Sequence, residues 1–500
     1  MVEKRYKQWN PNQQLLLPPS LQDWLPDDHP VYVLIEILEK LDLSEIHAKY
    51  QAKDARGTRP YPPQMMTGLL LYGYSTGVYS SRKLERATYE DIPFRLLCGG
   101  LHPDHTRISE FRRQHLEELK GIFAQVLQIC ERMGMVELGD IALDGTKVQA
   151  SASKHKAMSY ERMLKQRERL REEIAELMEE AEKTDRQEDD EFGRDKRGDE
   201  LPEELQRRED RLETLEQAIE ELEEEARQAR AKDLAEQADG HAETAETHED
   251  ETVRKGAATK AKNRREESQQ MAGGEEPETF ETPEGMPKHR PKRETGGTPK
   301  PKAQRNFTDP DSRIMKKGGS FLQGYNAQAA VDVASQIVLG YGLTNQASDA
   351  GNLMPMLRQA VGATKQLPGG VLADSGYWTE GIVEQVEAMG IDPLIAAGRE
   401  KETSRGSEAD GEPPEEADER TRMAHKLRTE QGRERYGQRK ASVEPVFGQM
   451  KEARGFRRFH LRGIEKARGE WALVCTGHNL QKLYDVWWDQ PAGTTLDGGW

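Results

Sequence analysis

Paired cysteines and long apolar runs are both missing from this chain of 500 residues. The three cysteines, Cys98, Cys130 and Cys475, are odd in number and far apart, which argues against a disulfide framework or a CxxC metal site and favours a reducing compartment. No apolar run approaches the roughly 18 residues of a membrane span, and the start MVEKRYKQW lacks a signal-peptide core. We therefore expect a soluble, cytoplasmic protein with no membrane partner.

Apolar residues are also scarce for the length of the chain. Hydrophobic residues make up 35% of the sequence and charged residues 33%, so part of the chain cannot contribute to a core. The length exceeds that of one ordinary domain and indicates two or three.

An excess of positive charge, which is common in DNA-binding proteins, is absent overall. The formal net charge is −17, but residues 161–250 hold 34 Asp and Glu against 16 Lys and Arg. Residues 431–468 hold 11 Lys and Arg against 4 Glu. Because phosphate neutralisation is local and charges are screened beyond about 10 Å at 0.1 M salt, the acidic total does not exclude a nucleic-acid partner.

Three acidic residues stand where a fold could bring them together. Asp144 in IALDGTKVQA and Asp374 in GGVLADSGYW each end a short apolar run, as expected where a buried strand delivers a side chain to a sheet edge. Glu444 lies in a segment with helical spacing, in which Val443 and Phe447 are four residues apart.

Carboxylates from two strand ends and one helix could hold two Mg²⁺ ions, with Mn²⁺ as a substitute. Two such ions, about 3.5–4 Å apart, activate an attacking oxygen and stabilise a leaving one at phosphorus. The alternative is that the aspartates bind turn amides and that Glu444 is a surface residue paired with Arg439 or Lys440.

Four motifs resemble the transposases of bacterial insertion sequences, within the IS-four/IS-five-like superfamily and its eleven-eighty-two group. They are LDGTKVQASASKHKAMSY, SFLQGYNAQAAVD, LADSGYW and a final block with Tyr436, Arg439 and VEPVFGQMK. The resemblance covers roughly residues 15–135, 138–160 and 305–485. It implies a ribonuclease-H-like catalytic domain with a DDE triad of Asp144, Asp374 and Glu444, all three serving as catalytic and metal-binding residues.

The same resemblance implies a Tyr-Arg-Glu-Lys signature formed by Tyr436, Arg439, Glu444 and Lys451. Four residues separate Arg439 from Glu444, where the superfamily pattern usually has three. Lys440 has the usual offset, so either cation could take the arginine role.

The activity that the resemblance implies is Mg²⁺-dependent hydrolysis at the element ends and strand transfer into target DNA. The expected partners are double-stranded DNA, as terminal inverted repeats and target, and a second copy of the chain in a DNA-bound homodimer associated with the nucleoid. Two alternatives remain open: a transposase-derived DNA-binding regulator without catalysis, and a ribonuclease-H-like nuclease without strand transfer.

Basic residues around Glu444 and in the N-terminal region are candidate DNA contacts, although a solvated basic face is the alternative. The predicted contacts are Tyr436, Arg439, Lys440, Lys451, Arg457, Arg458, Arg107, Arg112 and Arg113. Trp378, Phe456 and Phe459 are candidates for stacking on an unpaired base, with a core position equally open for Trp378. Asp332 and Asp349 are interpreted as a turn residue and a helix cap.

The chain is expected to form an α/β, ribonuclease-H-like catalytic domain with an all-α N-terminal domain and a helical coiled-coil insertion between the first two catalytic strands. The predicted segments are an extended tail (1–28), a helical DNA-binding domain (29–136), a first catalytic part (137–157), a coiled-coil hairpin (158–235), a disordered linker (236–304), a second catalytic part (305–485) with a polar loop (398–421), and a C-terminal tail (486–500). The acidic hairpin is expected to project away from DNA and either to dimerise or to shield the active site.

Overall fold

The computed structural model describes residues 20–51, 59–192, 203–398, 413 and 417–488. The chain forms two compact units, Met1–Met133 with Ala472–Trp500, and Gly134–Trp471. The predicted boundary near 485 is therefore wrong. The last long helix, α15 (Ile464–Trp488), divides between the units at Ala472. The later part of α15 joins the N-terminal helices because Gly477 lets it approach α3, where an added Cβ would lie 2.8 Å from the Tyr74 carbonyl.

The first unit is helical, as expected. Its helices are α1 (Pro30–Lys40), α2 (Ser44–Gln51), α3 (Pro63–Thr76), α4 (Ser81–Glu90), α5 (Ile92–Leu97), α6 (His105–Gln114) and α7 (Leu116–Arg132), preceded by a 3-10 turn at Gln22–Trp24. Helix α3 is buried on all sides, with Leu69, Leu70 and Leu71 fully enclosed. Asp104 caps α6 by accepting hydrogen bonds from the amides of Thr106 and Arg107, as its position before the helix predicts.

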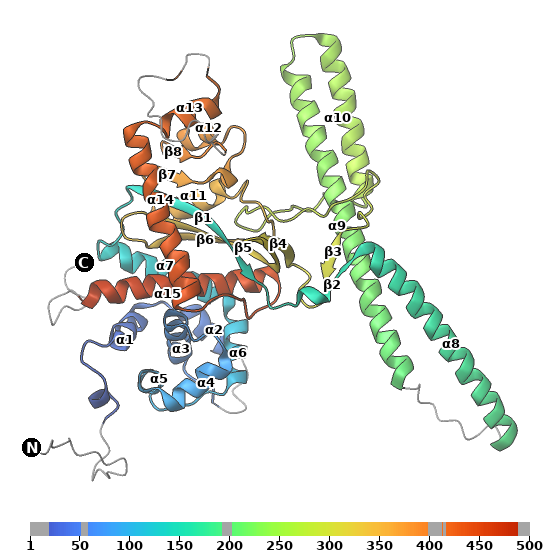
Figure 1. Cartoon of the computed structure of the whole chain (residues 1–500), viewed down its shortest axis with the longest axis horizontal. Helices are drawn as coiled ribbons and strands as arrows, with labels where there is room; N and C mark the ends of the chain where they lie inside the picture. The colour runs from blue at the N-terminus through green and yellow to red at the C-terminus, as the bar shows by residue number, and fades with distance from the viewer. Residues whose placement is uncertain (1–19, 52–58, 193–202, 399–412, 414–416, 489–500) are drawn as a thin grey trace, which may run out of the picture. The chain divides into compact units, whose positions relative to one another are not determined.

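The second unit contains a mixed sheet. Its strands are β1 (Asp140–Gln149), β4 (Arg313–Lys317), β5 (Ser320–Asp332), β6 (Val338–Thr344), β7 (Gly370–Ala373) and β8 (Asp392–Ile395). Strand β5 pairs antiparallel with β1 on one side and with β4 and β6 on the other. Strands β1, β7 and β8 are parallel, so the apolar runs before Asp144 and Asp374 lie side by side at the centre of the sheet (Figure 1).

Helices cover this sheet. They are α11 (Leu353–Thr364), α12 (Ile382–Glu387), α13 (Glu419–Lys426) and α14 (Glu430–Gly448), which continues into a π-helical turn at Gln449–Ala453. Short 3-10 turns lie at Lys154–Lys156 and Ser375–Tyr377. Helix α14 packs against β1 and β5 through a buried face that includes Arg439, Val443 and Val446. This packing sets the helix that carries Glu444 beside the strand that carries Asp144.

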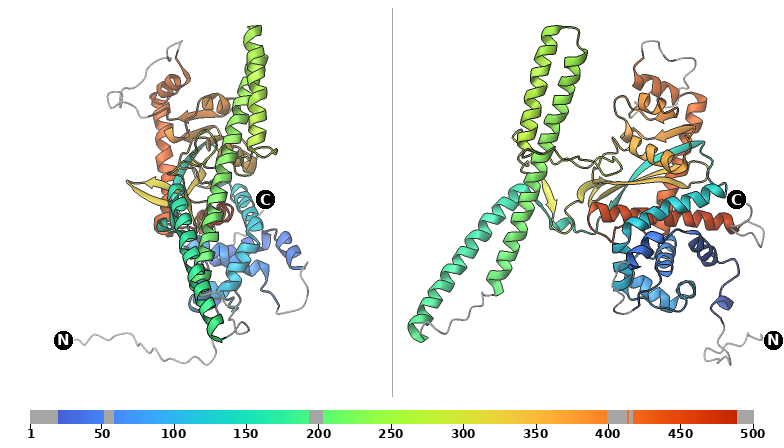
Figure 2. Two further views of the ribbon diagram at one scale, coloured as in Figure 1. Left: turned by 90° about the vertical axis from the view of Figure 1, so that its right-hand side faces the viewer. Right: turned by 180° about the vertical axis from the view of Figure 1, so that it is seen from behind.

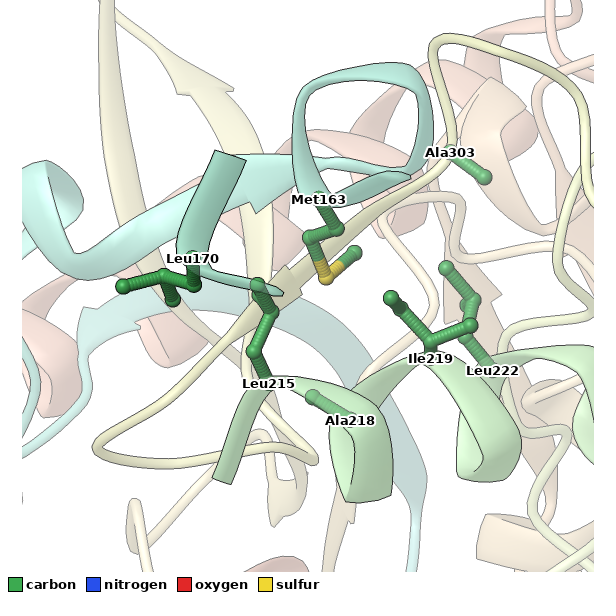
Figure 3. Packing of buried hydrophobic residues seen from close by; sticks show 7 residues of the cluster. All are labelled: Met163, Leu170, Leu215, Ala218, Ile219, Leu222 and Ala303. Atoms are coloured by element: carbon green, nitrogen blue, oxygen red, sulfur yellow. The ribbon is translucent and has the colours of Figure 1, made fainter. Parts of the chain in front are cut away.

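A helical insertion separates β1 from β4 and β5. Strands β2 (Ala157–Ser159) and β3 (Gln304–Asn306) pair at its base. Helices α8 (Tyr160–Phe192) and α9 (Glu203–Thr247) run antiparallel, because Tyr160 contacts Glu223 whereas Arg171 contacts Glu216. Figure 3 shows the apolar contacts that join them, made by Met163, Leu170, Leu215, Ala218, Ile219, Leu222 and Ala303. These apolar side chains are thus buried within one chain.

The prediction of a disordered linker over 236–304 is wrong. Helix α9 continues to Thr247 and pairs with α10 (Glu251–Met271), which lies beside it in every view (Figures 1 and 2). The Ser268 hydroxyl donates to the Ala231 carbonyl, and Arg265 pairs with Asp239. The contact surface is built mainly from alanines, including Ala238, Ala257 and Ala261. Such small side chains bury little apolar area each, which is why composition alone indicated disorder.

The Pro- and Gly-rich segment after α10 also has a defined path. Met286 is buried against Gly342 of β6 and Met356 of α11, and the His289 amide donates to Asn345 at 2.7 Å. Two isolated bridges, Glu281 with Pro287 and Arg293 with Pro299, close small loops within it. The segment therefore forms part of the second unit.

Several sequence-based segments fall wholly or partly outside the described residues. They are most of the N-terminal tail, most of the polar loop at 398–421 and most of the C-terminal tail. The end of the polar loop belongs to α13, and the first residues of the C-terminal tail belong to α15. Within the part of the chain that the structure describes, every helix is too short or too polar to cross a membrane.

Candidate active site

Asp144 and Asp374 meet because of the register between two parallel strands. Leu143 pairs with Ala373, so the next residue of each strand is an aspartate at the same level of the sheet. Strand β7 ends here, whereas β1 continues to Gln149 alongside β5. Each carboxylate accepts a hydrogen bond at 2.8 Å from a nearby backbone amide, Asp144 from Gly145 and Asp374 from Gly376. Two carboxylates thus lie adjacent at one sheet edge.

The pKa of Asp144 is raised to about 6, with burial as the largest cause. The neighbouring charges of Asp374 and Asp349 contribute to this shift, whereas Arg439 and the Gly145 amide oppose it. The carboxylate is therefore held in an enclosed site close to other negative charges. A bound cation would remove this repulsion.

Arg439 reaches this edge from α14. Its side chain is buried, and Nη1 lies 3.4 Å from Asp144 Oδ2. Its guanidinium carbon lies 5.9 Å from the centre of the Tyr436 ring. Lys440 is exposed. Of the two cations that the sequence left open for the arginine role, Arg439 is therefore the one beside the aspartate.

Glu444 lies on a different face of α14. Its side chain is exposed, whereas Arg439, Val443 and Val446 are buried against the sheet. At about 100° per residue, the five-residue step from Arg439 turns Glu444 about 140° around the helix. A four-residue step, which the superfamily pattern usually has, would end at Val443. The extra residue thus moves the carboxylate away from the face that meets Asp144, and its predicted catalytic role stays a prediction.

Asp349 is the acid that sequence reasoning assigned elsewhere. Its carboxylate accepts hydrogen bonds from Asn326 at 2.7 Å and Gln328 at 2.8 Å, and Lys147 Nζ lies 3.4 Å away. The residue before α11 is Asn352, so the predicted helix-cap role for Asp349 is wrong. No signal in the local sequence SDAGN predicts this position, because the partners come from β1 and β5. By contrast, Asp332 accepts from Ser335 in a turn, as expected.

Two glycines make room for Asp349 beside the aspartate pair. A Cβ at Gly145 would lie 2.4 Å from Asp349 Oδ1 and 2.3 Å from Gln328 Nε2. A Cβ at Gly376 would lie 2.9 Å from Asp374 Oδ1 and 3.2 Å from Asp349 Oδ2. Asp349 and Asp374 therefore approach one small region from two elements.

Lys451 reaches the same part of β1 from the π-helical turn. Its ammonium group donates to the hydroxyl of Thr146, two residues beyond Asp144. Burial and the nearby Lys317 lower the pKa of Lys451 to about 8. A π-helical turn has more residues per turn than an α-helix, so Lys451 points in a different direction from the one a continuous α-helix would give it. Such turns are frequent at functional sites.

The remaining predicted contacts of this unit have mixed outcomes. Arg457 and Arg458 are exposed, and Arg457 pairs with Glu452. Trp378 is half-buried, with the Arg420 guanidinium 5.6 Å from its ring centre. The stacking role predicted for Phe456 and Phe459 is wrong, because both side chains are fully buried and pack edge to face in the core.

Three arginines of α6 were predicted to bind DNA, and they differ sharply in burial. Arg112 is 4% exposed and donates to the Tyr74 hydroxyl and the Tyr79 carbonyl, so the prediction is wrong for this residue. Its guanidinium group links α6 to α3 and to the segment that follows α3. Arg107 is exposed and pairs with Glu110, and Arg113 lines a polar surface pocket with Arg82.

The aspartate pair offers carboxylate oxygens that could hold a cation. Across the described ranges, no group of three or more His, Cys, Asp and Glu side chains is close enough to enclose a metal ion. The geometry thus provides two adjacent carboxylates, a third one nearby in Asp349, and flanking cations in Arg439 of α14 and Lys451 of the π-helical turn.

Comparison with protein families matches both ends of the chain. Residues 19–114 match a family described as a transposase domain (DUF772), and residues 404–484 match a family described as a transposase DDE domain. The second match includes Arg439, Glu444 and Lys451 but begins after Asp144 and Asp374 in the sequence. No curated protein and no solved structure matches the chain. The two family matches indicate that the chain is a DDE transposase of an insertion sequence.

Proposed function

We propose that this transposase hydrolyses the phosphodiester bond at each end of its element and then joins the freed 3′-hydroxyl to target DNA. The observation that carries the proposal is the adjacency of Asp144 and Asp374 at the ends of parallel strands. Both steps are in-line displacements at phosphorus, so one site serves both without a covalent enzyme intermediate.

Asp144 and Asp374 are proposed to hold divalent cations, Mg²⁺ or Mn²⁺. The donor set fits, because hard cations take carboxylate oxygens and because Asp144 is enclosed with other negative charges that a cation would offset. When bound, the metal ions activate the attacking oxygen and stabilise the leaving one. Glu444, whose carboxylate is exposed on another face of α14, is proposed to act as the third acid only when DNA is bound, on the strength of the family pattern.

The other residues of the site are proposed to hold and orient the substrate. Arg439 favours the ionised form of Asp144 and offers a guanidinium to the scissile phosphate. Tyr436 and Lys451 flank it, and Lys440, Arg457 and Arg458 extend the contact along the backbone. Asp349 acts as a positioning residue, which sets the orientation of Lys147 and the charge near the aspartate pair.

The finer family assignment is part of the same proposal. The order β6-β5-β1-β7-β8, with three antiparallel strands followed by parallel ones, supports a ribonuclease-H-like catalytic domain. We place the chain in the eleven-eighty-two group and expect a homodimer on the element ends. Arg107 and Arg113 of the helical unit are proposed to contact the terminal repeats.

The test incubates purified protein and Mg²⁺ with labelled element-end DNA and a supercoiled target plasmid. The proposal predicts cleavage at the element end and a joined product. Cleavage without joining would favour a nuclease, and binding without cleavage would favour a regulator. A control reaction with EDTA should give binding alone.

A further inference from the structure

The hairpin formed by β4 and β5 exposes a group of residues that the site above does not use. Its turn is Gly318-Gly319, both with positive φ, which only glycine adopts readily. On either side stand Lys316, Lys317 and Phe321, all exposed. Phe321 is 63% exposed, more than any other large apolar side chain among the described residues.

The hairpin tip lies beside the catalytic strand. Lys317 Nζ donates to the Lys147 carbonyl at 3.2 Å, three residues beyond Asp144 along β1. Phe321 pairs with Lys316, the neighbour of Lys317. By strand alternation, Phe321 lies on the same face of β5 as Ala329, the residue opposite Asp144. The exposed ring and the catalytic aspartate therefore belong to one face of the sheet.

Two lysines from different elements meet between this tip and the aspartates. The Lys317 side chain is near that of Lys451, and each ammonium group contacts a neutral oxygen, of Lys147 and Thr146 respectively. Within the described ranges, neither lysine forms an ion pair with a carboxylate. The two adjacent cations repel each other, and the nearby carboxylates of Glu452 and Asp144 offset only part of this effect on Lys451. A phosphate group between the two lysines would relieve the repulsion.

A single exposed apolar side chain needs no explanation by itself. Phe321 differs because lysines surround it, because its hairpin is tied to β1, and because it shares a face with Asp144. Aromatic rings among cations are the feature by which proteins bind single-stranded nucleic acid without sequence preference, through stacking and backbone neutralisation.

We propose that the β4–β5 hairpin binds the unpaired strand at an opened DNA end, with Lys317 and Lys451 sharing a backbone phosphate and Phe321 stacking on a base beyond it. The inference rests on the proposed function and deepens it by adding a second contact for the DNA end. It concerns binding alone and involves no change of covalent bonds.

The experiment uses the full chain in EDTA, so that binding is measured apart from cleavage. The probes are a blunt duplex and the same duplex with an unpaired overhang of about six nucleotides carrying 2-aminopurine. The wild-type protein should prefer the overhang and change the 2-aminopurine fluorescence on binding. Phe321→Ala should lower this preference about tenfold and abolish the fluorescence change, and Phe321→Trp should keep both. Lys317→Gln should weaken binding to both probes and reduce the salt dependence by about one phosphate contact.

Leu367→Ala is the matched control, because Leu367 is another apolar residue of this unit, 54% exposed. It should change neither the affinity nor the fluorescence. If Phe321→Ala keeps the overhang preference and the fluorescence change, the inference is overturned while the proposed function stands. If the wild-type protein binds neither probe, both are overturned.

Discussion

At the scale of single residues, the site depends on which side chains the sheet register brings together. Pairing of Leu143 with Ala373 puts Asp144 and Asp374 at the same level of the sheet. The apolar run before each aspartate is the only feature of the local sequence that predicts this position. Asp349 joins them from a loop because Gly145 and Gly376 have no side chain. The third acid of the family pattern, by contrast, is turned away by one extra helical residue.

Substitutions of Asp349 and of Glu444 should affect Mn²⁺ binding differently in protein free of DNA. Asp349→Asn should weaken Mn²⁺ binding about tenfold, because a positioning group next to the ligands is lost. Glu444→Gln should leave Mn²⁺ binding unchanged, because its carboxylate is exposed on another face of α14. Titration calorimetry of each variant measures this. A large loss with Glu444→Gln and none with Asp349→Asn would contradict the arrangement described.

Lys451 should make DNA affinity depend on pH near neutrality. Its pKa is lowered from the ordinary lysine value to about 8, so the ammonium charge is present below pH 8 and is lost as the pH rises through that value. Affinity for a DNA duplex should therefore fall about tenfold between pH 7 and 9. Lys451→Arg should flatten this dependence, because arginine stays charged. An identical pH profile for the two proteins would refute the assignment.

At the scale of elements, the sequence predicts those helices and strands that have a clear apolar pattern. The apolar runs before Asp144 and Asp374 form β1 and β7, and the segment predicted to be helical forms the helices of the first unit, because these segments have clear apolar patterns. The pairing of α9 with α10 was missed, since it uses Ala238, Ala257 and Ala261 in place of large apolar residues. Burial of Arg112 and Phe456 was missed because tertiary packing decides it.

The apolar cluster between α8 and α9 should stabilise the helical hairpin without affecting the stability of the sheet. Leu222→Ala removes a side chain that is 1% exposed, so it should destabilise the hairpin by about 2–5 kcal/mol. Amide hydrogen exchange should then become faster in α8 and in the facing part of α9, while β1 and β7 remain protected. Met178→Ala on α8, where the side chain is 47% exposed, is the control and should have little effect. Equal effects of the two changes would argue against the packing in Figure 3.

At the scale of the whole molecule, the insertion buries its apolar stripe on its own helices. A second copy of the chain is therefore not needed for that purpose. Replacing residues 172–213 by a short Gly/Ser linker would keep Leu170, Leu215 and the rest of the cluster. We expect the shortened protein to fold and to retain metal-dependent end cleavage, because Asp144, Asp374 and Arg439 come from other elements.

A folded but inactive protein would instead show that the outer part of the hairpin belongs to the catalytic machinery. Size-exclusion chromatography with light scattering on DNA-bound protein adds a separate result. Loss of the dimer with retained cleavage would assign dimerisation to the hairpin. More cleavage of unrelated DNA would assign it a shielding role.

Cleavage of element-end DNA by Asp374→Asn in Mg²⁺ tests directly whether this sheet edge is the active site. The change removes a charge and keeps the shape of the side chain, so we expect near-normal DNA binding with cleavage below detection. Asp144→Asn should give the same result, because the two carboxylates are proposed to hold the same metal ions. Cleavage by Asp374→Asn at the wild-type rate would contradict the assignment of this sheet edge as the active site.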